Sequence, residues 1–383
     1  MIKENKTISI INQDSGYLMI DIANAFVENG FKVNLITGRL VQRNKSLHPN
    51  VRIINIVKYN RNSTFKRAAT WGLATLQLLF LGWFRLRKTH LLIVSNPPTA
   101  TLLPLVIKNS YSLLIYDVYP DALVEYNVFK KDSYLIKKWQ KVNTKIYKKA
   151  ATILTLNEGM KNRLAKYIFK DNIAVVPIWT DNSFLQPISK ENNPFVIEHK
   201  LQDKFIIMYS GNLGKTHNIE ILISLAEMLK DESSYILIIG GGTQFTSIQS
   251  LIKQKELKNI KLLPWQPVEK LPFTLASADI GVVSLGSEAS NLSIPSKTFN
   301  LMSVGTPILS ISEADSALGK LIEEYRIGQN FKNTDVENIH HFVESLKEDK
   351  ELRSSYSANS LKASKNFGPN NAFKIVKICM QNI

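Results

Sequence analysis

The 383-residue sequence has a single cysteine, Cys379, which excludes an internal disulfide and is typical of a reducing compartment. Its six histidines show no metal-ligand spacing with one another or with carboxylates, so no metal site is predicted. Met1–Lys6 is polar and leads directly into an apolar run, so we expect no signal peptide. Apolar residues make up 44% of the chain, enough for a large core, and the length predicts two domains.

Acidic residues are scarce in the first half. Residues 1–180 contain 27 Lys and Arg but 10 Asp and Glu, whereas the rest of the chain contains 21 and 22. The net charge of +16 therefore belongs to the first half. Such segregation predicts a polyanionic partner there: anionic lipid, a phosphate-bearing acceptor or nucleic acid.

The uncharged run Ala68–Phe84 has 17 residues, the short limit for a bilayer span, and it contains Gln77. Basic residues flank it and tryptophans lie near its ends, which favours a helix lying on a membrane surface, with a buried helix or a true span as alternatives. The residues assigned to the membrane are Lys66, Arg67, Trp71, Leu79, Trp83, Arg85, Arg87 and Lys88. Lys130–Lys149 predicts a second basic helix face.

Strand-like and helical segments alternate along the first half, beginning with the strand Thr7–Asn12 and the loop Asp14–Gly16. This pattern predicts a doubly wound parallel sheet, and the single glycine of the loop excludes a dinucleotide fingerprint. Asp117 and Asp121 follow a strand, where ligands of such sheets collect. They are candidates for a general base or an acceptor-hydroxyl ligand; the alternative is that they cap the following turn.

The second half repeats the alternation after a polar segment, Asp181–Lys204, which we interpret as a linker and domain entry. A strand at Phe205–Tyr209 leads into the loop Ser210–Lys215. Its glycines allow backbone N–H groups to approach phosphate, and Lys215 adds charge, although the spacing is not that of a Walker loop.

Ser293–Leu309 predicts a helix that starts at Ile294 or Pro295, is capped by Ser293 and closes at Gly305. Lys297 lies in the first turn, where its positive charge is unfavourable because the helix dipole is positive at that end. A bound anion would make this position favourable. The segment is therefore a candidate anion site. An ordinary helix with a solvated lysine is the alternative.

In their order and spacing, these pieces resemble a family 4-type retaining glycosyltransferase of the GT-B architecture, in the branch that acts in bacterial O-antigen and capsular polysaccharide synthesis. The carriers of the resemblance are SNPP at Ser95–Pro98, DVYPD at Asp117–Asp121, LTLNEGM at Leu154–Met160, YSGNLGK at Tyr209–Lys215, IGGG at Ile239–Gly242, LASADIGVVSL at Leu275–Leu285 and IPSK…GTPIL at Ile294–Leu309.

The resemblance implies two Rossmann-like doubly wound domains facing a cleft. Residues 1–180 form a membrane-facing acceptor domain, residues 181–367 a nucleotide-sugar domain, and residues 368–383 a helix that crosses back to the first. It implies a donor site made of Gly211, Asn212, Gly214, Lys215, Gly241, Trp265, Gln266, Val268, Glu288, Ser296, Lys297 and Asn300. Ser15, Gly16 and Tyr119 fall on the acceptor side, and Asp117, Asp121, Lys215 and Lys297 are the catalytic candidates.

This sequence departs from the family pattern at several site positions. Asn212 and His217 stand where the family carries Arg and Lys. We therefore assign the positive charge that would bind phosphate to Lys215 and Lys297. The family's paired glutamates fall at Leu292 and Asn300, and its histidine at the end of the acceptor-domain strand falls at Tyr116 or Asp117.

The expected activity is transfer of a hexosyl or N-acetylaminosugar unit from a nucleotide sugar, in the first instance a UDP-sugar, to a polyprenyl-diphosphate-linked saccharide. The resemblance implies retention, no metal and no other cofactor. We expect a cytoplasmic protein, peripheral on the inner face of the membrane, without a nucleic-acid partner. The alternatives are a nucleic-acid-binding protein, a sugar-nucleotide epimerase on the same fold and a non-catalytic homologue.

Overall fold

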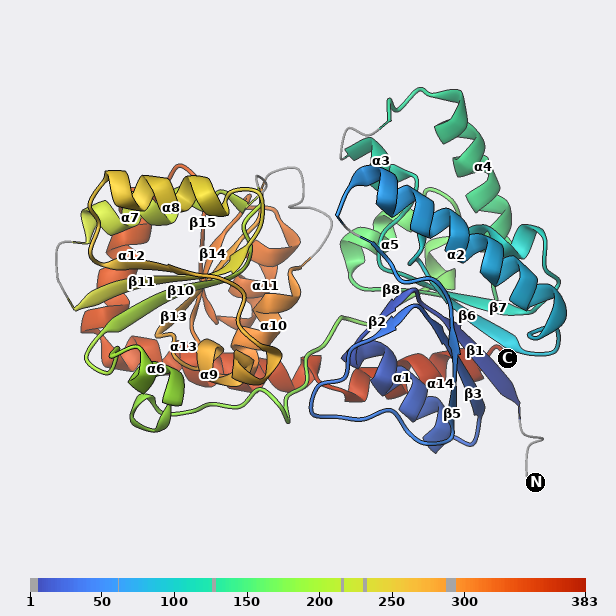
Figure 1. Ribbon diagram of the computed structural model, residues 1–383, viewed down its shortest axis with the longest axis horizontal. Coiled ribbons are helices and arrows are strands. Elements are labelled where there is room, and N and C mark those ends of the chain that lie inside the picture. Colours follow the sequence, from blue (N-terminus) through green and yellow to red (C-terminus); the bar gives the residue numbers. More distant parts are fainter. Residues whose placement is uncertain (1–5, 61, 126–128, 215–216, 230–232, 287–293) are drawn as a thin grey trace. The chain divides into compact units, whose positions relative to one another are not determined.

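The computed structural model describes residues 6–60, 62–125, 129–214, 217–229, 233–286 and 294–383 (Figure 1). The chain forms two compact units. The first comprises Met1–Ile178 and Pro369–Ile383, and the second comprises Trp179–Gly368. The chain therefore returns to the first unit after completing the second.

The described elements of the first unit are β1 (Thr7–Ile11), β2 (Asp14–Ser15), α1 (Tyr17–Glu28), β3 (Lys32–Thr37), β4 (Arg39–Leu40), β5 (Val51–Asn55), α2 (Thr64–Phe84), β6 (His90–Val94), η1 (Pro98–Leu105), β7 (Tyr111–Ile115), α3 (Asp121–Glu125), α4 (Tyr134–Lys149), β8 (Thr152–Thr155), α5 (Glu158–Leu164), η2 (Lys170–Asn172), β9 (Ile173–Val175) and α14 (Asn370–Met380).

A seven-stranded parallel sheet, in the order β5-β3-β1-β6-β7-β8-β9, organises this unit. Its central strands, such as His90–Val94, are buried along their whole length, as expected for a parallel sheet covered on both faces. One apolar cluster packs α2, η1, α4 and α5 on one face. On the other face α14 lies beside α1 (Figure 1).

The described elements of the second unit are η3 (Lys190–Asn192), α6 (Pro194–Glu198), β10 (Phe205–Asn212), α7 (Glu220–Met228), β11 (Ser234–Gly241), α8 (Phe245–Gln254), β12 (Ile260–Leu263), η5 (Val268–Lys270), α9 (Leu271–Leu275), β13 (Ile280–Ser284), α10 (Ser296–Ser303), β14 (Ile308–Ile311), α11 (Ala317–Tyr325), β15 (Gly328–Phe331), α12 (Val336–Glu348), α13 (Lys350–Ser364) and η7 (Lys365–Phe367).

Six parallel strands in the order β12-β11-β10-β13-β14-β15 form the sheet of this unit. A single apolar cluster joins α7, α8 and α12 to one face, and α10 contacts β13 and β14. The expected doubly wound α/β fold is thus present in both units.

Asp181–Lys204, which was expected to be a linker and domain entry, contains the helix α6, whose Phe195 and Val196 are buried and whose first turn is capped by Asn193. The strand β15 lies at the edge of the sheet and is a short polar segment that the sequence pattern did not predict.

Because α14 packs in the first unit, replacing a buried residue of this helix should destabilise that unit. The Ile375 side chain is 1% exposed, so Ile375→Ala should lower the free energy of unfolding of the first unit by about 2–5 kcal/mol. The exposed neighbour Lys374 supplies the control Lys374→Ala, which should be neutral. Urea denaturation measures both, and equal effects of the two variants would contradict this packing.

Candidate functional site

The helix α10 has its N-terminus close to the ends of β10 and β13. It begins at Ser296, with Pro295 in the cap position, one or two residues later than expected. The expected cap, Ser293, lies outside the described residues. The other end is as predicted: Gly305 has φ 75°, a left-handed conformation that favours glycine and closes the helix.

Lys297 points from the first turn of α10 toward the end of β10. Its Nζ lies 3.8 Å from the centroid of the Tyr209 ring, a cation–π contact. Although the residue is half-buried, Nζ itself is shielded from solvent and has no hydrogen-bond partner among the described residues. Desolvation lowers the pKa of this ammonium to about 7. The solvated-lysine alternative is therefore wrong.

Glycines make room for this ammonium at the strand ends. A Cβ on Gly211 would lie 3.0 Å from Lys297 Nζ and 3.4 Å from the Tyr209 hydroxyl. A Cβ on Gly240, which has φ 158°, would lie 1.9 Å from the Gly211 carbonyl oxygen. Side chains are thus excluded where β10 and β11 end, because the Lys297 ammonium and the Gly211 backbone already occupy the space that they would need.

His217 lies beside the same ammonium. Its Nδ1 is 3.2 Å from the Ser284 carbonyl oxygen, which can only accept, so Nδ1 carries the proton. Desolvation and the charge of Lys297 lower the pKa of His217. The imidazole is therefore neutral near pH 7, and the site holds one buried cation rather than two.

The remaining donor candidates differ in their positions. The Trp265 ring, 59% exposed, lies against Gly241, whose Cβ would be 2.7 Å from the indole nitrogen. Asn212 lies beside Gly214, whose Cβ would be 2.9 Å from Asn212 Nδ2. Asn300 Oδ1 already accepts a 2.6 Å hydrogen bond from Thr180.

Three further donor candidates have no partner in the cluster around Lys297. Gln266 donates to the Pro264 carbonyl oxygen at 3.0 Å, Val268 begins η5, and Ser296 is exposed. Lys215 and Glu288, which were expected to contribute, lie outside the described residues.

Asp117 and Asp121 have different environments at the end of β7. Asp117 is exposed, although the protein atoms around its carboxyl desolvate it enough to raise its pKa. Asp121 Oδ1 accepts hydrogen bonds from Gln140 Nε2 and the Tyr167 hydroxyl, both at 2.9 Å. The geometry leaves Asp117 as the available carboxylate, whereas Asp121 is held in a structural network. The carbonyl of Tyr119 accepts a hydrogen bond from Asn143.

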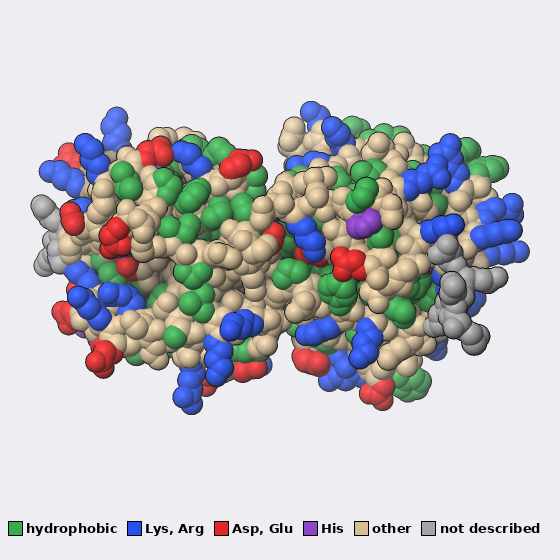
Figure 2. Space-filling view, turned by 90° about the horizontal axis from the view of Figure 1, so that it is seen from below, with side chains coloured by type: hydrophobic (Ala, Val, Ile, Leu, Met, Phe, Trp, Pro, Cys, Tyr) green, Lys and Arg blue, Asp and Glu red, His purple; other side chains and the backbone are tan. Residues whose placement is uncertain are grey.

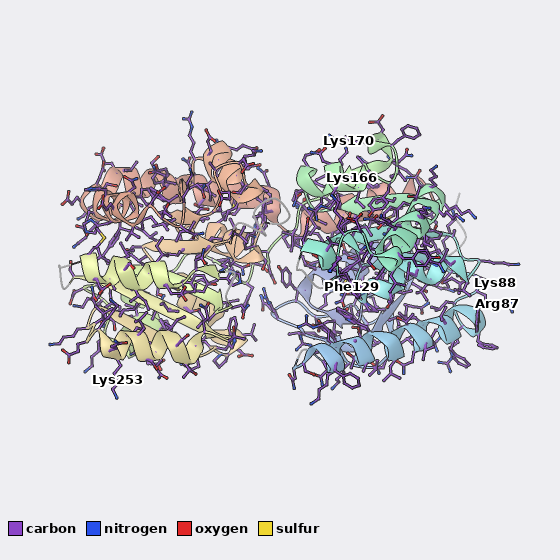
Figure 3. The ribbon with its side chains drawn as sticks, turned by 90° about the horizontal axis from the view of Figure 1, so that it is seen from above. Arg87, Lys88, Phe129, Lys166, Lys170 and Lys253 are labelled. Atoms are coloured by element: carbon purple, nitrogen blue, oxygen red, sulfur yellow. The ribbon has the colours of Figure 1, made fainter. Side chains whose placement is uncertain are left out.

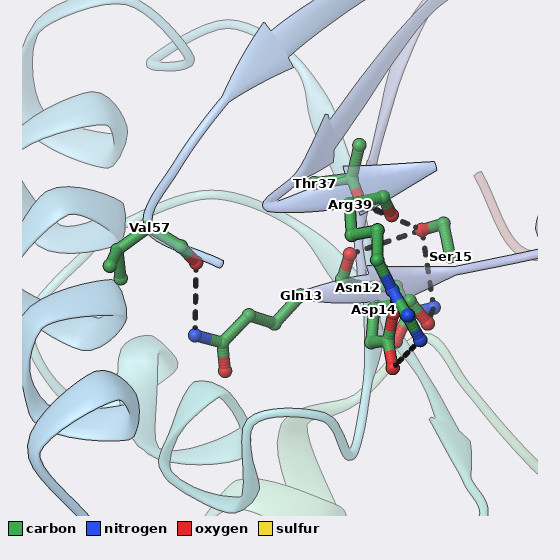
Figure 4. Close-up of polar contacts among 7 residues, drawn as sticks. All are labelled: Asn12, Gln13, Asp14, Ser15, Thr37, Arg39 and Val57. Atoms are coloured by element: carbon green, nitrogen blue, oxygen red, sulfur yellow. Dashed lines mark hydrogen bonds and ion pairs between the residues drawn. The ribbon is translucent and has the colours of Figure 1, made fainter. Parts of the chain in front are cut away.

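The segment after β1 is tied together by internal hydrogen bonds (Figure 4). The Ser15 hydroxyl is buried, donates to the Asn12 carbonyl and accepts from Thr37. This side chain therefore supports the loop rather than facing an acceptor. Gly16 follows it as the residue that precedes α1. Asp14 pairs with Arg39 at 2.6 Å, and of the two side chains that of Arg39 is exposed whereas that of Asp14 is largely buried.

The helix α2 has one buried and one exposed apolar face. Ala74, Leu78 and Leu81 are in the core. The exposed apolar side chains are Phe65, Leu73, Leu76, Phe80, Trp83 and Phe84, which we name the α2 apolar face. Lys66, Arg67, Arg85, Arg87 and Lys88 are exposed around its two ends, and Figure 3 labels the last two.

Two residues assigned to the membrane do not lie on the α2 apolar face. Trp71 stacks on Tyr59 with ring centroids 5.8 Å apart, and its indole nitrogen is buried. Leu79 packs against the core. Within the described parts of the chain, no helix is long and apolar enough to cross a membrane.

Comparisons with known proteins agree with this architecture. HepE of Anabaena, whose structure was solved in complex with UDP-glucose, superposes with a TM-score of 0.71 at 11% identity, covering 99% of this chain and 100% of that one. The fold is therefore the two-domain GT-B architecture. The family model "Glycosyl transferases group 1" matches residues 189–363. The matched residues lie in the second unit, which is therefore similar to this family.

Two curated relatives have glycosyltransferase names. The probable glycosyltransferase WbjE of Pseudomonas aeruginosa is 27% identical over 234 residues, covering 61% of this chain and 58% of that protein. The putative colanic acid biosynthesis glycosyl transferase WcaI of Escherichia coli K12 is 28% identical over 177 residues, covering 45% and 43%. The chain spans about half the length of the curated relatives it matches.

The buried ammonium predicts an unusual stability effect. Below pH 7 both folded and unfolded chains carry the Lys297 proton, and the folded state bears the full cost of burying it. Between about pH 7 and 10.5 the unfolded chain binds more protons, so this cost fades as pH rises. Lys297→Met should therefore stabilise the second unit by roughly 2 kcal/mol at pH 6 and by less at pH 9.5.

Urea denaturation at the two pH values measures this difference. Lys320→Met removes an exposed lysine on α11 and serves as the matched control, with no stabilisation expected. A Lys297→Met protein that is less stable than the wild type at pH 6 would show that the ammonium is not unpaired.

Proposed function

We propose that this protein is a glycosyltransferase that moves a sugar from a UDP-sugar to a lipid-linked saccharide acceptor at an anionic membrane surface. The observation that carries the proposal is the buried Lys297 ammonium, which has no hydrogen-bond partner among the described residues and lies in the part of the chain that the family model matches. A diphosphate at the ends of β10 and β11 would supply its missing partner. The UDP-glucose complex of the structurally similar HepE supports the donor class.

The chemistry needs charge stabilisation more than acid–base groups. When the sugar–phosphate bond breaks, negative charge grows on the departing nucleotide diphosphate. A preorganised ammonium in a desolvated site stabilises that charge more in the transition state than in the ground state. Lys297 has this role in the proposal, and Asp117 guides the proton of the acceptor hydroxyl. Retention and independence from metals belong to the same proposal.

Trp265 offers its exposed ring as a stacking surface for the base of the nucleotide. The adjacent Gly241 leaves the indole uncovered by a side chain of its own. The WbjE and WcaI names support a role in polysaccharide synthesis, with colanic acid as the product named for WcaI. The nucleic-acid-binding and epimerase alternatives find no support in these similarities.

The α2 apolar face supports the membrane component of the proposal. An amphipathic helix with aromatic side chains and basic ends lies well in the interface between headgroups and acyl chains. Each Lys or Arg close to an anionic surface contributes about 1 kcal/mol to binding. We propose that α2 holds the protein on the inner face of the membrane, where a lipid-linked acceptor is accessible.

If Lys297 takes up a proton when the diphosphate binds, UDP binding at pH 8 should be accompanied by uptake of nearly one proton. The reason is that a free pKa of about 7 leaves the amine mostly neutral at that pH, and an adjacent dianion raises it. Calorimetry in buffers of different ionisation enthalpy measures the uptake. It should disappear in Lys297→Met and persist in Lys320→Met.

The same variant should lower sugar transfer by about tenfold to a thousandfold, the usual loss for one transition-state contact. EDTA should leave the wild-type rate unchanged. Proton uptake that persists in Lys297→Met, or a normal rate for that variant, would contradict the role given to this lysine.

Membrane binding should depend on the α2 apolar face. Leu76→Ser with Phe80→Ser should weaken binding to phosphatidylglycerol vesicles at high salt at least tenfold, because apolar burial remains when salt screens the basic residues. Both positions are exposed, so the fold should be retained. Ile197→Ser with Phe373→Ser, at exposed apolar positions elsewhere, is the control. Equal losses in both pairs would contradict the assignment.

A further inference from the structure

A cavity of about 760 Å³ lies in the first unit, lined by side chains from α3, from the segment before α4, from α4 and α5, and from the turn that follows α5. Five basic residues and two carboxylates line it. Its position among α3, α4 and α5 separates it from the segment after β1 and from the α2 apolar face. None of the contacts described for those two regions involves its lining.

The two carboxylates of the cavity are already engaged. Glu125 forms an ion pair with Arg163, with Arg163 Nη1 donating to Glu125 Oε2 at 2.6 Å. Asp121 accepts from the Tyr167 hydroxyl and from Gln140. Burial and the charge of Asp121 raise the pKa of Tyr167, so the phenol stays protonated and continues to donate. Hydrogen bonds from these neutral donors leave the charge of Asp121 in place, so five basic and two acidic side chains give the cavity lining a net charge of +3.

Four lysines contribute the excess charge. Lys137 pairs with Asp132 at 3.1 Å on the exposed rim. Lys131, Lys141 and Lys166 have no carboxylate within ion-pair distance in the described parts of the chain, and Figure 3 labels Lys166. Like charges that share one hollow repel each other, and an anion between them removes that repulsion. The cavity thus has the charge pattern of a polyanion site.

We propose that this cavity binds a diphosphate group, the one that joins the lipid and the saccharide of the acceptor. The inference rests on the proposed function for the identity of the acceptor. Three lysines free of carboxylate partners match the two to three negative charges of a diphosphate diester or monoester. The cavity is also large enough for a diphosphate and part of the attached sugar, and the lysines are flexible point charges suited to phosphate oxygens.

The test titrates two soluble probes, inorganic pyrophosphate and geranyl diphosphate, into the full chain by calorimetry. UDP is present at saturation to occupy the site at Lys297. Both probes should bind the wild type. Lys141→Gln with Lys166→Gln should weaken both by at least about tenfold, because two charged hydrogen bonds are lost. The affinity for UDP should not change.

Lys138→Gln with Lys145→Gln is the matched control. These two lysines are exposed on α4, the helix that carries Lys141, but they do not line the cavity. This pair should change probe affinity less than about twofold. Equal weakening by both pairs would show diffuse attraction to a basic surface and overturn the proposal. Probe binding that is unaffected by the cavity pair would overturn it as well.

Phosphatidylglycerol vesicles separate the two sources of phosphate. The cavity pair should leave vesicle binding unchanged. If it lowers vesicle binding while the soluble diphosphates bind normally, the cavity holds a lipid headgroup and the proposal is wrong. A chain that does not bind UDP would refute the proposed function, whereas the response of probe binding to the two variant pairs still reports on the cavity.

Discussion

A buried ammonium that has no hydrogen-bond partner in the described part of the chain is the constraint around which the second unit is arranged. Removing Lys297 from water is costly, and the face of the Tyr209 ring returns part of that cost. The side chain fits because residue 211 has no Cβ. His217 avoids a second positive charge by staying neutral. A protein that only needed stability would place an apolar residue there, so the arrangement is best explained by an anionic ligand.

The parallel sheets explain where this site is. Strands buried on both faces expose polar backbone groups only at their ends, and helices that follow point their N-termini toward the same edge. In the second unit β10, β11 and α10 meet in this way. The glycines at 211 and 240 then allow Lys297 and the two strand ends to pack closely, because a Cβ at either position would meet neighbouring atoms.

Much of this was predictable from the sequence. Continuous apolar runs such as Ile206–Tyr209 identify parallel strands. The unfavourable placement of Lys297 in a first helical turn indicated an anion site. The strand Gly328–Phe331 was missed because it is short, polar and at the sheet edge. The internal bonding of Ser15 and Asp121 could not be predicted either, since their partners Thr37, Gln140 and Tyr167 are distant in sequence.

The α2 segment shows why the sequence of an apolar helix does not reveal which of its faces is exposed. Apolar residues surround this helix, so periodicity alone cannot distinguish Leu78 in the core from Leu76 at the surface.

The positive charge of the first unit does not by itself identify the kind of partner that this unit binds. On the face that Figure 2 draws, a group of basic side chains lies at one end of this unit, and further basic side chains lie elsewhere on it, some beside acidic ones; on the second unit basic and acidic side chains are interspersed. A nucleic-acid site combines such charge with exposed aromatic residues along a groove. Here the exposed aromatic residues lie on a helix with basic ends, and a separate hollow holds lysines without carboxylate partners among the described residues. The proposed interfacial burial and phosphate recognition would account for both features together.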